Sequence, residues 1–185
     1  MQNRKKTGTE AFRFDVSLVE ELKRAAKNAG MTKNAFMNAL LADRLLIDPL
    51  VRTFHRISLS DEAFRSILGC ADADAVEMTG SEIARKNFPL VCELYRRSGH
   101  PLSFREFLTK ILGKHAGWFQ VEEDGDGPQR SMTLTHPFGR KWSIFIKSYI
   151  LSAYTTISKD KIKIEIADQF LRIDFSSYSP AEFPN

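Results

Sequence analysis

Apolar and polar residues alternate between Ala11 and Phe14, so that Phe12 and Phe14 face one side of an extended segment. A period of two is typical of a β-strand with one buried face. After Asp15, a residue type that caps helix N-termini, the apolar spacing changes to three and four residues, which predicts an amphipathic helix. The apolar stripe of this helix consists of Leu18, Leu22, Ala25, Ala26 and Ala29.

A second helix follows after a tight turn. Gly30 stands where a helix end commonly needs a residue with positive φ, and Thr32 can cap a helix predicted from about Lys33 to Leu46. This helix is too apolar for a surface helix, because its apolar residues cover more than one stripe. They are Ala35, Phe36, Met37, Ala39, Leu40, Leu41, Ala42, Leu45 and Leu46.

This order of strand, helix, turn and helix resembles the ribbon-helix-helix family of DNA-binding proteins, over roughly residues 8–47. The resemblance implies that two chains pair their strands into an antiparallel ribbon, which lies in the DNA major groove. It therefore implies an intertwined homodimer bound to double-stranded DNA. The residues that carry it are Arg13-Phe14-Asp15, then Leu18, Leu22, Ala26 and Gly30, and finally Thr32 and Asn34.

The resemblance also assigns the DNA contacts. Thr9, Ala11 and Arg13 take the base-reading positions of the ribbon, and Phe12 and Phe14 become core. Alanine cannot hydrogen-bond a base edge, so polar readout falls to Thr9 and to Arg13, whose guanidinium can address guanine O6 and N7. The phosphate contacts are assigned to Arg4, Lys5, Lys6, Thr32, Lys33 and Asn34.

Two features of the residues favour a dimer independently. The strand has no partner within the next forty residues, and unpaired strand groups are costly when buried. The second helix is too apolar for a surface helix, and two interlocked copies of the chain would solve both problems together. The alternative is an ordinary helical hairpin with a frayed N-terminus, in which the Phe alternation and the two caps are coincidences.

Length and composition bound the remaining possibilities. The chain has 185 residues, 43% of them hydrophobic, which suits one or two domains with a sizeable core. It has no membrane-length apolar run and no signal-peptide pattern, so we expect a cytoplasmic protein without a membrane partner. Residues 1–52 hold ten Lys or Arg and six Asp or Glu, whereas residues 53–185 hold 17 of each. The net charge of +4 therefore lies on the segment that resembles a DNA-binding domain.

The fold class predicted for the whole chain is α+β. The ribbon-helix-helix domain spans residues 9–48 and a second domain spans residues 53–176; we expect a disordered basic arm at 1–8 and a disordered tail at 177–185. Pro49 is expected to end the second helix. In the second domain we predict a strand at 53–58, a helix at 60–70, a loop with a short strand at 71–79, a helix at 81–98 that Pro89 kinks or divides, and a helix at 103–117. Strands at 118–122 and 131–135 around a turn, a helix at 140–154 and strands at 161–166 and 170–175 complete an antiparallel sheet with covering helices.

The most distinctive string of the second domain is THPFGRKWS, at residues 135–143. A glycine turn that leads into a helix N-terminus can bind an anion, so the candidate contacts for an effector are His136, Gly139, Arg140 and Lys141. The string resembles sequences in C-terminal domains of archaeal regulators, but this resemblance implies no particular ligand. The alternative, which we favour, is a tight β-to-α connection packed on Trp142.

Metal-binding and catalytic motifs are absent from the sequence. Ribbon-helix-helix proteins fused to a nickel-sensing domain are known, but the four histidines and two cysteines show no HxxxH, HxH, CxxC or CxH spacing. A site assembled in space from Cys70, Cys92 and one histidine is the remaining metal hypothesis. There is no nucleophile elbow, Walker loop or dinucleotide fingerprint. We therefore expect no metal, no cofactor and no enzymatic activity.

The leading hypothesis is a dimeric, sequence-specific transcriptional regulator whose ribbon reads the major groove. Its C-terminal domain would sense a small-molecule or protein effector, or drive further assembly. The competing hypothesis is an antitoxin-like or scaffold dimerisation module whose C-terminal domain binds a protein partner. A third hypothesis makes the C-terminal domain an enzyme that the N-terminus delivers to DNA.

Overall fold

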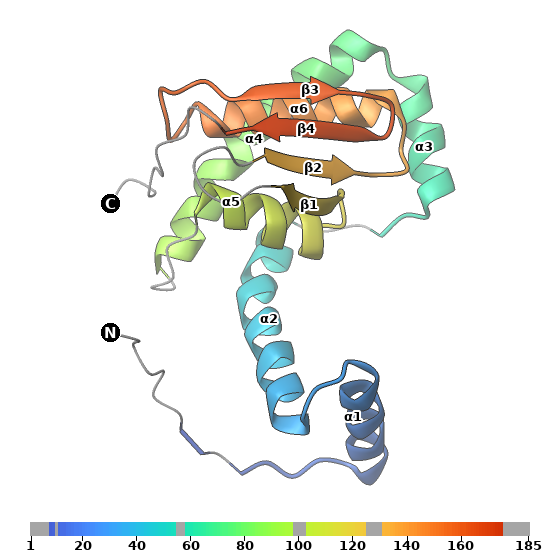
Figure 1. The fold of residues 1–185 in the computed structure, drawn as a ribbon, viewed down its shortest axis with the longest axis vertical. Helices are drawn as coiled ribbons and strands as arrows, with labels where there is room; N and C mark the ends of the chain where they lie inside the picture. The colour runs from blue at the N-terminus through green and yellow to red at the C-terminus, as the bar shows by residue number, and fades with distance from the viewer. Residues whose placement is uncertain (1–7, 10, 55–57, 98–102, 125–130, 176–185) are drawn as a thin grey trace. The chain divides into compact units, whose positions relative to one another are not determined.

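The computed structural model (Figure 1) describes residues 8–9, 11–54, 58–97, 103–124 and 131–175. The chain divides into two compact units, Met1–Pro49 and Leu50–Asn185, called the first and the second unit below. In the described part of the chain, no helix combines the length and the hydropathy that crossing a membrane requires. The predictions for the basic arm at residues 1–7 and for the tail lie outside the described residues.

The first unit contains the two predicted helices, α1 (Val16–Asn28) and the first part of α2 (Lys33–Phe54). Asp15 is the N-cap residue of α1, although its side chain accepts no hydrogen bond from the helix. The predicted cap of α2 is present, since Thr32 Oγ1 accepts a hydrogen bond of 3.2 Å from the amide of Ala35.

The geometry of the turn between α1 and α2 explains why glycine occupies position 30. The amide of Gly30 donates to the carbonyl of Lys27 at 3.0 Å, and the amide of Met31 donates to the carbonyl of Ala26 at 2.9 Å. These two bonds form a Schellman motif, which places the residue after the C-cap in the left-handed region. Gly30 adopts φ of 64° there, a conformation that costs glycine nothing and most other residues about 1 kcal/mol or more.

Proline lies inside two helices, α2 at Pro49 and α4 (Ala73–Arg97) at Pro89. A proline in a helix interior removes one backbone hydrogen bond and crowds the preceding turn, at a cost of about 3 kcal/mol. In α4 the buried residues Phe88 and Val91 flank the proline, and their packing stabilises the helix on both sides of it. The prediction that a helix ends before Pro49 is therefore wrong, and Pro89 does not divide α4.

The second unit begins its described part with α3 (Asp61–Cys70), as predicted. Ser60 Oγ caps this helix by accepting from the amide of Ala63 at 3.2 Å. The strand predicted at 53–58 is wrong where it can be judged: residues 53 and 54 belong to α2, residue 58 is in no strand, and residues 55–57 lie outside the described part.

The loop with a short strand predicted at 71–79 is also wrong. Asp72 Oδ1 accepts from the amide of Ala75 at 2.7 Å, so this aspartate caps α4 and the residues after it are helical. The sequence carries this signal, an aspartate followed by good helix formers.

The helix predicted at 103–117 is present as α5 (Phe104–Glu106) followed by η1 (Phe107–His115). It starts at a capping box, in which Ser103 Oγ accepts from the amide of Glu106 and the Glu106 carboxylate accepts from the amide of Ser103. Most of its length is π-helical, a rare form that the sequence did not indicate. Gly117, with φ of 66°, follows its end.

Four antiparallel strands form one sheet in the order β1-β2-β4-β3. Strand β2 and helix α6 have the predicted bounds, whereas β1 starts two residues later than predicted and β3 is shorter. Most of the turn predicted between β1 and β2 lies outside the described residues. The bounds are β1 (Gln120–Asp124), β2 (Ser131–Thr135), α6 (Arg140–Tyr154), β3 (Lys163–Ile166) and β4 (Phe170–Asp174).

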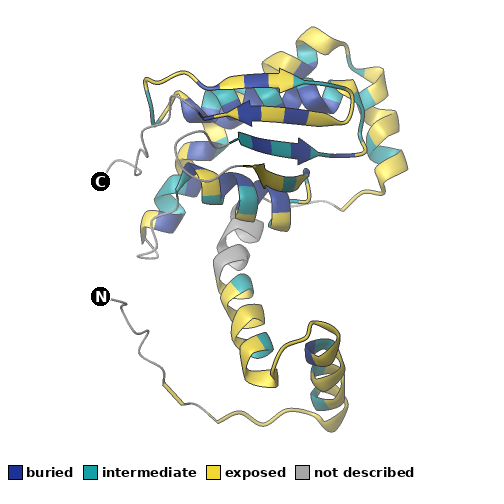
Figure 2. Ribbon diagram, viewed as in Figure 1, coloured by how far each residue is buried: buried dark blue, intermediate teal, exposed yellow. Residues whose placement is uncertain are grey.

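The sheet buries one face and leaves the other polar. In the register, Leu134 of β2 lies opposite Val121 of β1 and Leu171 of β4, and Met132 lies opposite Ile173. These side chains are buried or half-buried, while their neighbours along each strand point to the other face. Helices α4 and α6 lie behind the sheet in Figure 1, and Figure 2 shows the alternation of burial along the strands. The α+β class of the chain is confirmed, with helices that cover an antiparallel sheet.

Helices α4 and α6 approach each other at their backbones. A Cβ atom at Gly80 would lie 2.6 Å from the carbonyl oxygen of Phe145, so only glycine fits this position. Beside it, Ser148 Oγ donates to the carbonyl of Glu77 at 2.6 Å and receives a hydrogen bond of 2.7 Å from Ser81 Oγ. Close packing and satisfied hydroxyl groups together fix the register of the two helices.

Candidate nucleic-acid interface and effector site

The predicted base-reading residues lie in an exposed segment before α1. Thr9, Ala11 and Arg13 are all exposed, and the described residues of this segment form no strand within the single chain. Phe12 is 69% exposed and Phe14 is 45% exposed, with ring centroids 6.2 Å apart. A β-ribbon needs a hydrogen-bonding neighbour, which in the prediction comes from a second chain. The ribbon therefore stays a prediction.

The predicted phosphate contacts at the start of α2 are accessible. Thr32, Lys33 and Asn34 are exposed, and the first turn of α2 contains no acidic residue. The amides of this turn and the Lys33 ammonium group are compatible with an anion. The other predicted phosphate contacts, Arg4, Lys5 and Lys6, lie outside the described residues.

The first unit buries almost none of its apolar surface. Ala26 is its single buried residue among those whose burial the structure describes. Figure 2 shows that most described residues of α1 and of the first part of α2 are exposed. Among the residues whose burial is described, the exposed large apolar side chains of this unit are Phe12, Phe14, Val16, Leu18, Met31, Leu40, Leu41 and Leu45. A unit with so much apolar surface and so little core is incomplete on its own.

In the second unit, the predicted effector residue His136 is buried in the turn between β2 and α6. Its Nε2 lies 2.9 Å from Ser143 Oγ, and its Nδ1 accepts from the amide of Phe138 at 3.2 Å. Because Nδ1 accepts a hydrogen bond, the proton of the neutral ring is assigned to Nε2, which donates to Ser143. Burial lowers the pKa of His136 to about 4, so the ring is neutral at neutral pH.

The His136–Ser143 pair does not have the arrangement of a hydrolytic dyad. A general base needs Nε2 free to accept the serine proton, while Nδ1 donates to its orienting group. Here Nδ1 accepts a hydrogen bond and Nε2 donates one to Ser143, and Ser143 is fully buried. The pair therefore fixes the turn.

Lys141 also has an internal role. Its Nζ donates to the carbonyls of Gly69, at 2.8 Å, and Ala71, at 2.5 Å, where α3 ends. Among the other predicted effector residues, Gly139 adopts φ of 81°, and Arg140 is exposed with its guanidinium 3.9 Å from the Asp168 carboxylate. The internal contacts of His136 and Lys141 support a tight β-to-α connection at this turn.

The residue that sequence reasoning missed at this turn is Phe64 of α3. Its ring meets the rings of Phe138 and Trp142 edge to face, with centroid distances of 5.1 and 4.9 Å. Trp142 is buried, as the favoured interpretation of this turn requires. The sequence pattern around Phe64 predicted its helix but not a contact more than seventy residues away.

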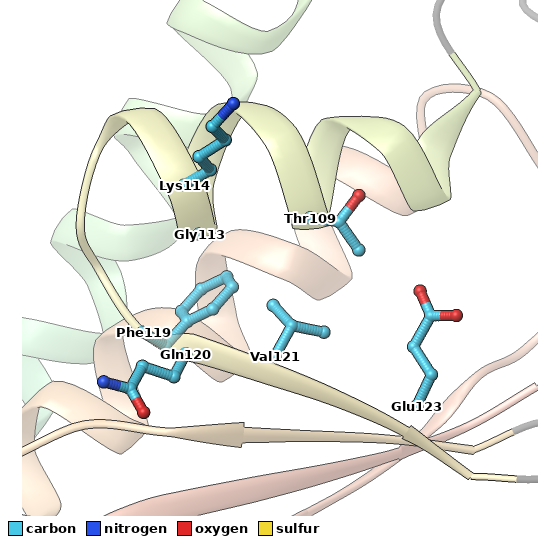
Figure 3. A pocket seen from close by; sticks show the side chains of 7 residues that line it. All are labelled: Thr109, Gly113, Lys114, Phe119, Gln120, Val121 and Glu123. Carbon is cyan, nitrogen blue, oxygen red and sulfur yellow. The ribbon is translucent and has the colours of Figure 1, made fainter. Parts of the chain in front are cut away.

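A hollow of about 420 Å³ lies between η1 and strand β1 (Figure 3). Phe119 and Val121 form its apolar part, and the polar side chains of Thr109, Gln120 and Glu123 lie around it. The Glu123 carboxylate accepts a hydrogen bond of 2.9 Å from Arg105. The acidic group of the hollow is therefore already paired.

The cysteines and histidines form no metal centre in the described part of the chain, where no three His, Cys, Asp or Glu side chains are grouped to hold an ion. Cys70 is exposed, and burial raises the pKa of the Cys92 thiol to about 11. A thiol with a raised pKa is a poor thiolate donor at neutral pH.

The chain matches no protein-family model, no curated protein and no solved structure. Its function is therefore inferred from its own residues. In the first unit these are exposed cationic and apolar side chains, and in the second unit they are a network of internal contacts around the β2–α6 turn.

Proposed function

We propose that the protein is a dimeric, sequence-specific DNA-binding transcriptional regulator of the ribbon-helix-helix type. The observation that carries this proposal is the near absence of a core in the first unit, whose single described buried residue is Ala26. Burial of apolar surface is the main driving force for folding, so a unit that exposes Phe12, Phe14 and Leu45 is stable only against a partner.

A second copy of the chain is the partner that meets each need of the first unit. Its strand would supply the missing hydrogen bonds to residues 9–15, and its copy of α2 would cover the apolar residues Leu40 and Leu41. The two chains would then place Phe12 and Phe14 in a shared core. The opposite face of the ribbon would carry Arg13, with Thr9 and Ala11, toward the bases.

Charge supports DNA as the ligand of this dimer. The excess of positive charge lies in residues 1–52, and each dimer would carry it twice. Cations that neutralise phosphates release bound counterions, which gives the affinity and a steep dependence on salt.

The second unit has its own core of buried residues in helices α4 and α6 and in the sheet. It does not need the first unit for stability, so we assign it the sensing of an effector or a further assembly contact. The competing function, an antitoxin-like or scaffold module, uses the same apolar surface and differs in what the dimer binds.

The test is a selection of random DNA duplexes by the full-length protein, combined with sedimentation equilibrium. We expect a dimer that enriches one palindromic or repeated site, with an affinity that falls steeply between about 50 and 200 mM salt. A monomer, or a dimer that enriches no sequence, would contradict the proposal. A dimer without DNA binding that captures a protein partner insensitively to salt would support the scaffold function instead.

A further inference from the structure

Helix α3 is held to the rest of the second unit by few groups. None of its residues is buried, and its exposed side chains include Ile67, at 61%. The contacts described above involve its two ends: the ring of Phe64 near the start, and the carbonyls of Gly69 and Ala71 at the C-terminus. An element with so little buried surface opens at a low free-energy cost.

The aromatic surface that receives Phe64 is fixed without α3. The indole Nε1 of Trp142 donates to the carbonyl of Trp118 at 3.0 Å, and its ring stacks on Phe145 at 4.7 Å with an interplanar angle of 6°. The ring of Phe138 stacks on His136 at 6.2 Å. The rings of Phe138 and Trp142 also meet each other edge to face, with centroids 6.0 Å apart, so the aromatic surface that they form would keep its shape when Phe64 leaves it.

The second contact of α3 has the character of an anion bound to an ammonium group. The final carbonyls of a helix lack partners within the helix and carry the negative end of its dipole. Lys141 Nζ meets two such oxygens, those of Gly69 and Ala71, at 2.8 and 2.5 Å. A carboxylate also offers two oxygens, and it adds a full negative charge that makes the hydrogen bonds stronger.

We propose that this site binds an aromatic carboxylate in place of α3. The aryl ring would occupy the position of Phe64 against Phe138 and Trp142, and the carboxylate would replace the two carbonyl oxygens on Lys141. Phe64 and Gly69 are five residues apart, which corresponds to about 7.5 Å along a helix axis. The Phe64 side chain leans toward the N-terminus and the carbonyls point toward the C-terminus, so the ring and the oxygens lie farther apart than this. The ligand class is therefore an aryl group joined to its carboxylate by an alkyl chain.

This binding goes beyond DNA recognition and does not depend on it, since every contact lies in the second unit. Ligand and α3 compete for one site, so the ligand binds the state in which α3 is released. Helix α3 is the first described helix after α2 along the chain.

The test is titration calorimetry of the full-length protein with phenylbutyrate, with neutral phenylbutyramide as the matched compound. We expect phenylbutyrate to bind at least about tenfold more tightly than phenylbutyramide, because the neutral amide cannot form an ion pair with Lys141. Hydrogen exchange of the α3 amides should become faster when phenylbutyrate is bound. No DNA is present, so the result is independent of the proposed regulatory function.

Three variants sharpen the test. Phe64→Ala removes the internal competitor and should tighten phenylbutyrate binding by about threefold or more, because the open state becomes more populated. Lys141→Gln should weaken binding about tenfold, whereas Lys147→Gln, on the same helix, should not change it. If Phe64→Ala fails to fold, Phe64→Leu gives the same direction with a smaller change.

The proposal is overturned if phenylbutyrate binds neither the parent protein nor the Phe64 variant. It is also overturned if binding slows exchange in α3, or if Lys141→Gln and Lys147→Gln bind equally well. If Phe64 only stabilised the fold, the Phe64 variant would bind phenylbutyrate more weakly than the parent protein. Competition between Phe64 and the ligand predicts the opposite, tighter binding by the variant.

Discussion

The Nε2 of His136 donates to Ser143 Oγ across 2.9 Å, and this bond joins the end of β2 to the first turn of α6. The backbone amide of His136 donates to the carbonyl of Gln169 at 2.9 Å, and Ser143 Oγ lies 3.5 Å from the carbonyl of Asp168. The neutral imidazole thus holds the β2–α6 turn together, and the His136 amide and the Ser143 hydroxyl attach this turn to the one between β3 and β4.

Stability should therefore depend on pH through His136. Burial lowers the pKa of this ring from 6.5 to about 4 in the folded chain, so between these values the unfolded chain binds a proton that the folded chain does not. The contribution is complete above pH 6.5 and is lost as pH falls through 4, by about 3 kcal/mol of unfolding free energy. Urea unfolding followed by circular dichroism at several pH values measures it.

Carboxylates also titrate in the lower part of this pH range, so the histidine needs its own control. His136→Gln removes the titrating ring and keeps an amide that can hydrogen-bond Ser143. We expect the difference in unfolding free energy between the parent and this variant to shrink as pH falls from 7 to 4. A difference that stays constant with pH would show that His136 does not titrate as inferred.

Gly80 gives a prediction about packing between α4 and α6. A methyl group there would lie 2.6 Å from the Phe145 carbonyl oxygen, so Gly80→Ala should lower the free energy of unfolding by about 1–3 kcal/mol. Gly69→Ala is the matched control, because it is also in a helix and has no atom within 4 Å of the added carbon. It should be neutral or stabilising by up to about 1 kcal/mol. Equal effects of the two substitutions on chemical unfolding would rule out the close contact.

Phe14 tests the shared core of the proposed dimer. In the single chain Phe14 is 45% exposed, so Phe14→Ser should change the stability of a monomer little. In a ribbon dimer the same substitution removes a buried ring and should lower the stability of the dimer by about 3 kcal/mol or more. We expect the variant to sediment as a monomer at concentrations where the parent is a dimer. A variant that dimerises as well as the parent would place Phe14 outside the interface.

Arg13 tests base reading separately from assembly. Arg13→Ala should weaken binding to the preferred duplex by about 1–3 kcal/mol and relax the preference at one position of the site, because one bidentate contact to guanine is lost. Helix content and dimerisation should stay unchanged. Unchanged affinity in a fluorescence anisotropy titration would exclude Arg13 as a base-reading residue.

Elements with a local signal could be predicted from the sequence. Strand β2 and helix α6 have the predicted bounds, and the side chains of Thr32, Ser60 and Ser103 cap their helices as their positions suggest. Both kinds of signal depend on neighbours within four residues along the chain. The same is true of Asp72, which caps α4 although the prediction places it in a loop.

Contacts over long sequence distances could not be predicted. Lys141 meets the carbonyl of Gly69 across 72 positions, and nothing in either local pattern indicates the other. The sequence offers His136 and Lys141 as candidate contacts of an effector but does not indicate the internal partner that the fold gives to each of them. The ribbon at residues 9–15 needs atoms of another chain, so its prediction depends on the resemblance and on the exposed apolar surface.

The backbone contact at Gly80 has a mechanical consequence. Two helices that touch without intervening side chains, and that share the hydroxyl bonds of Ser81 and Ser148, can neither slide nor rotate against each other without a steric clash. Helices α4 and α6 therefore behave as one rigid unit packed against the sheet. The conformational freedom of the second unit is then confined to its periphery, to elements such as α3 that are attached at a few points.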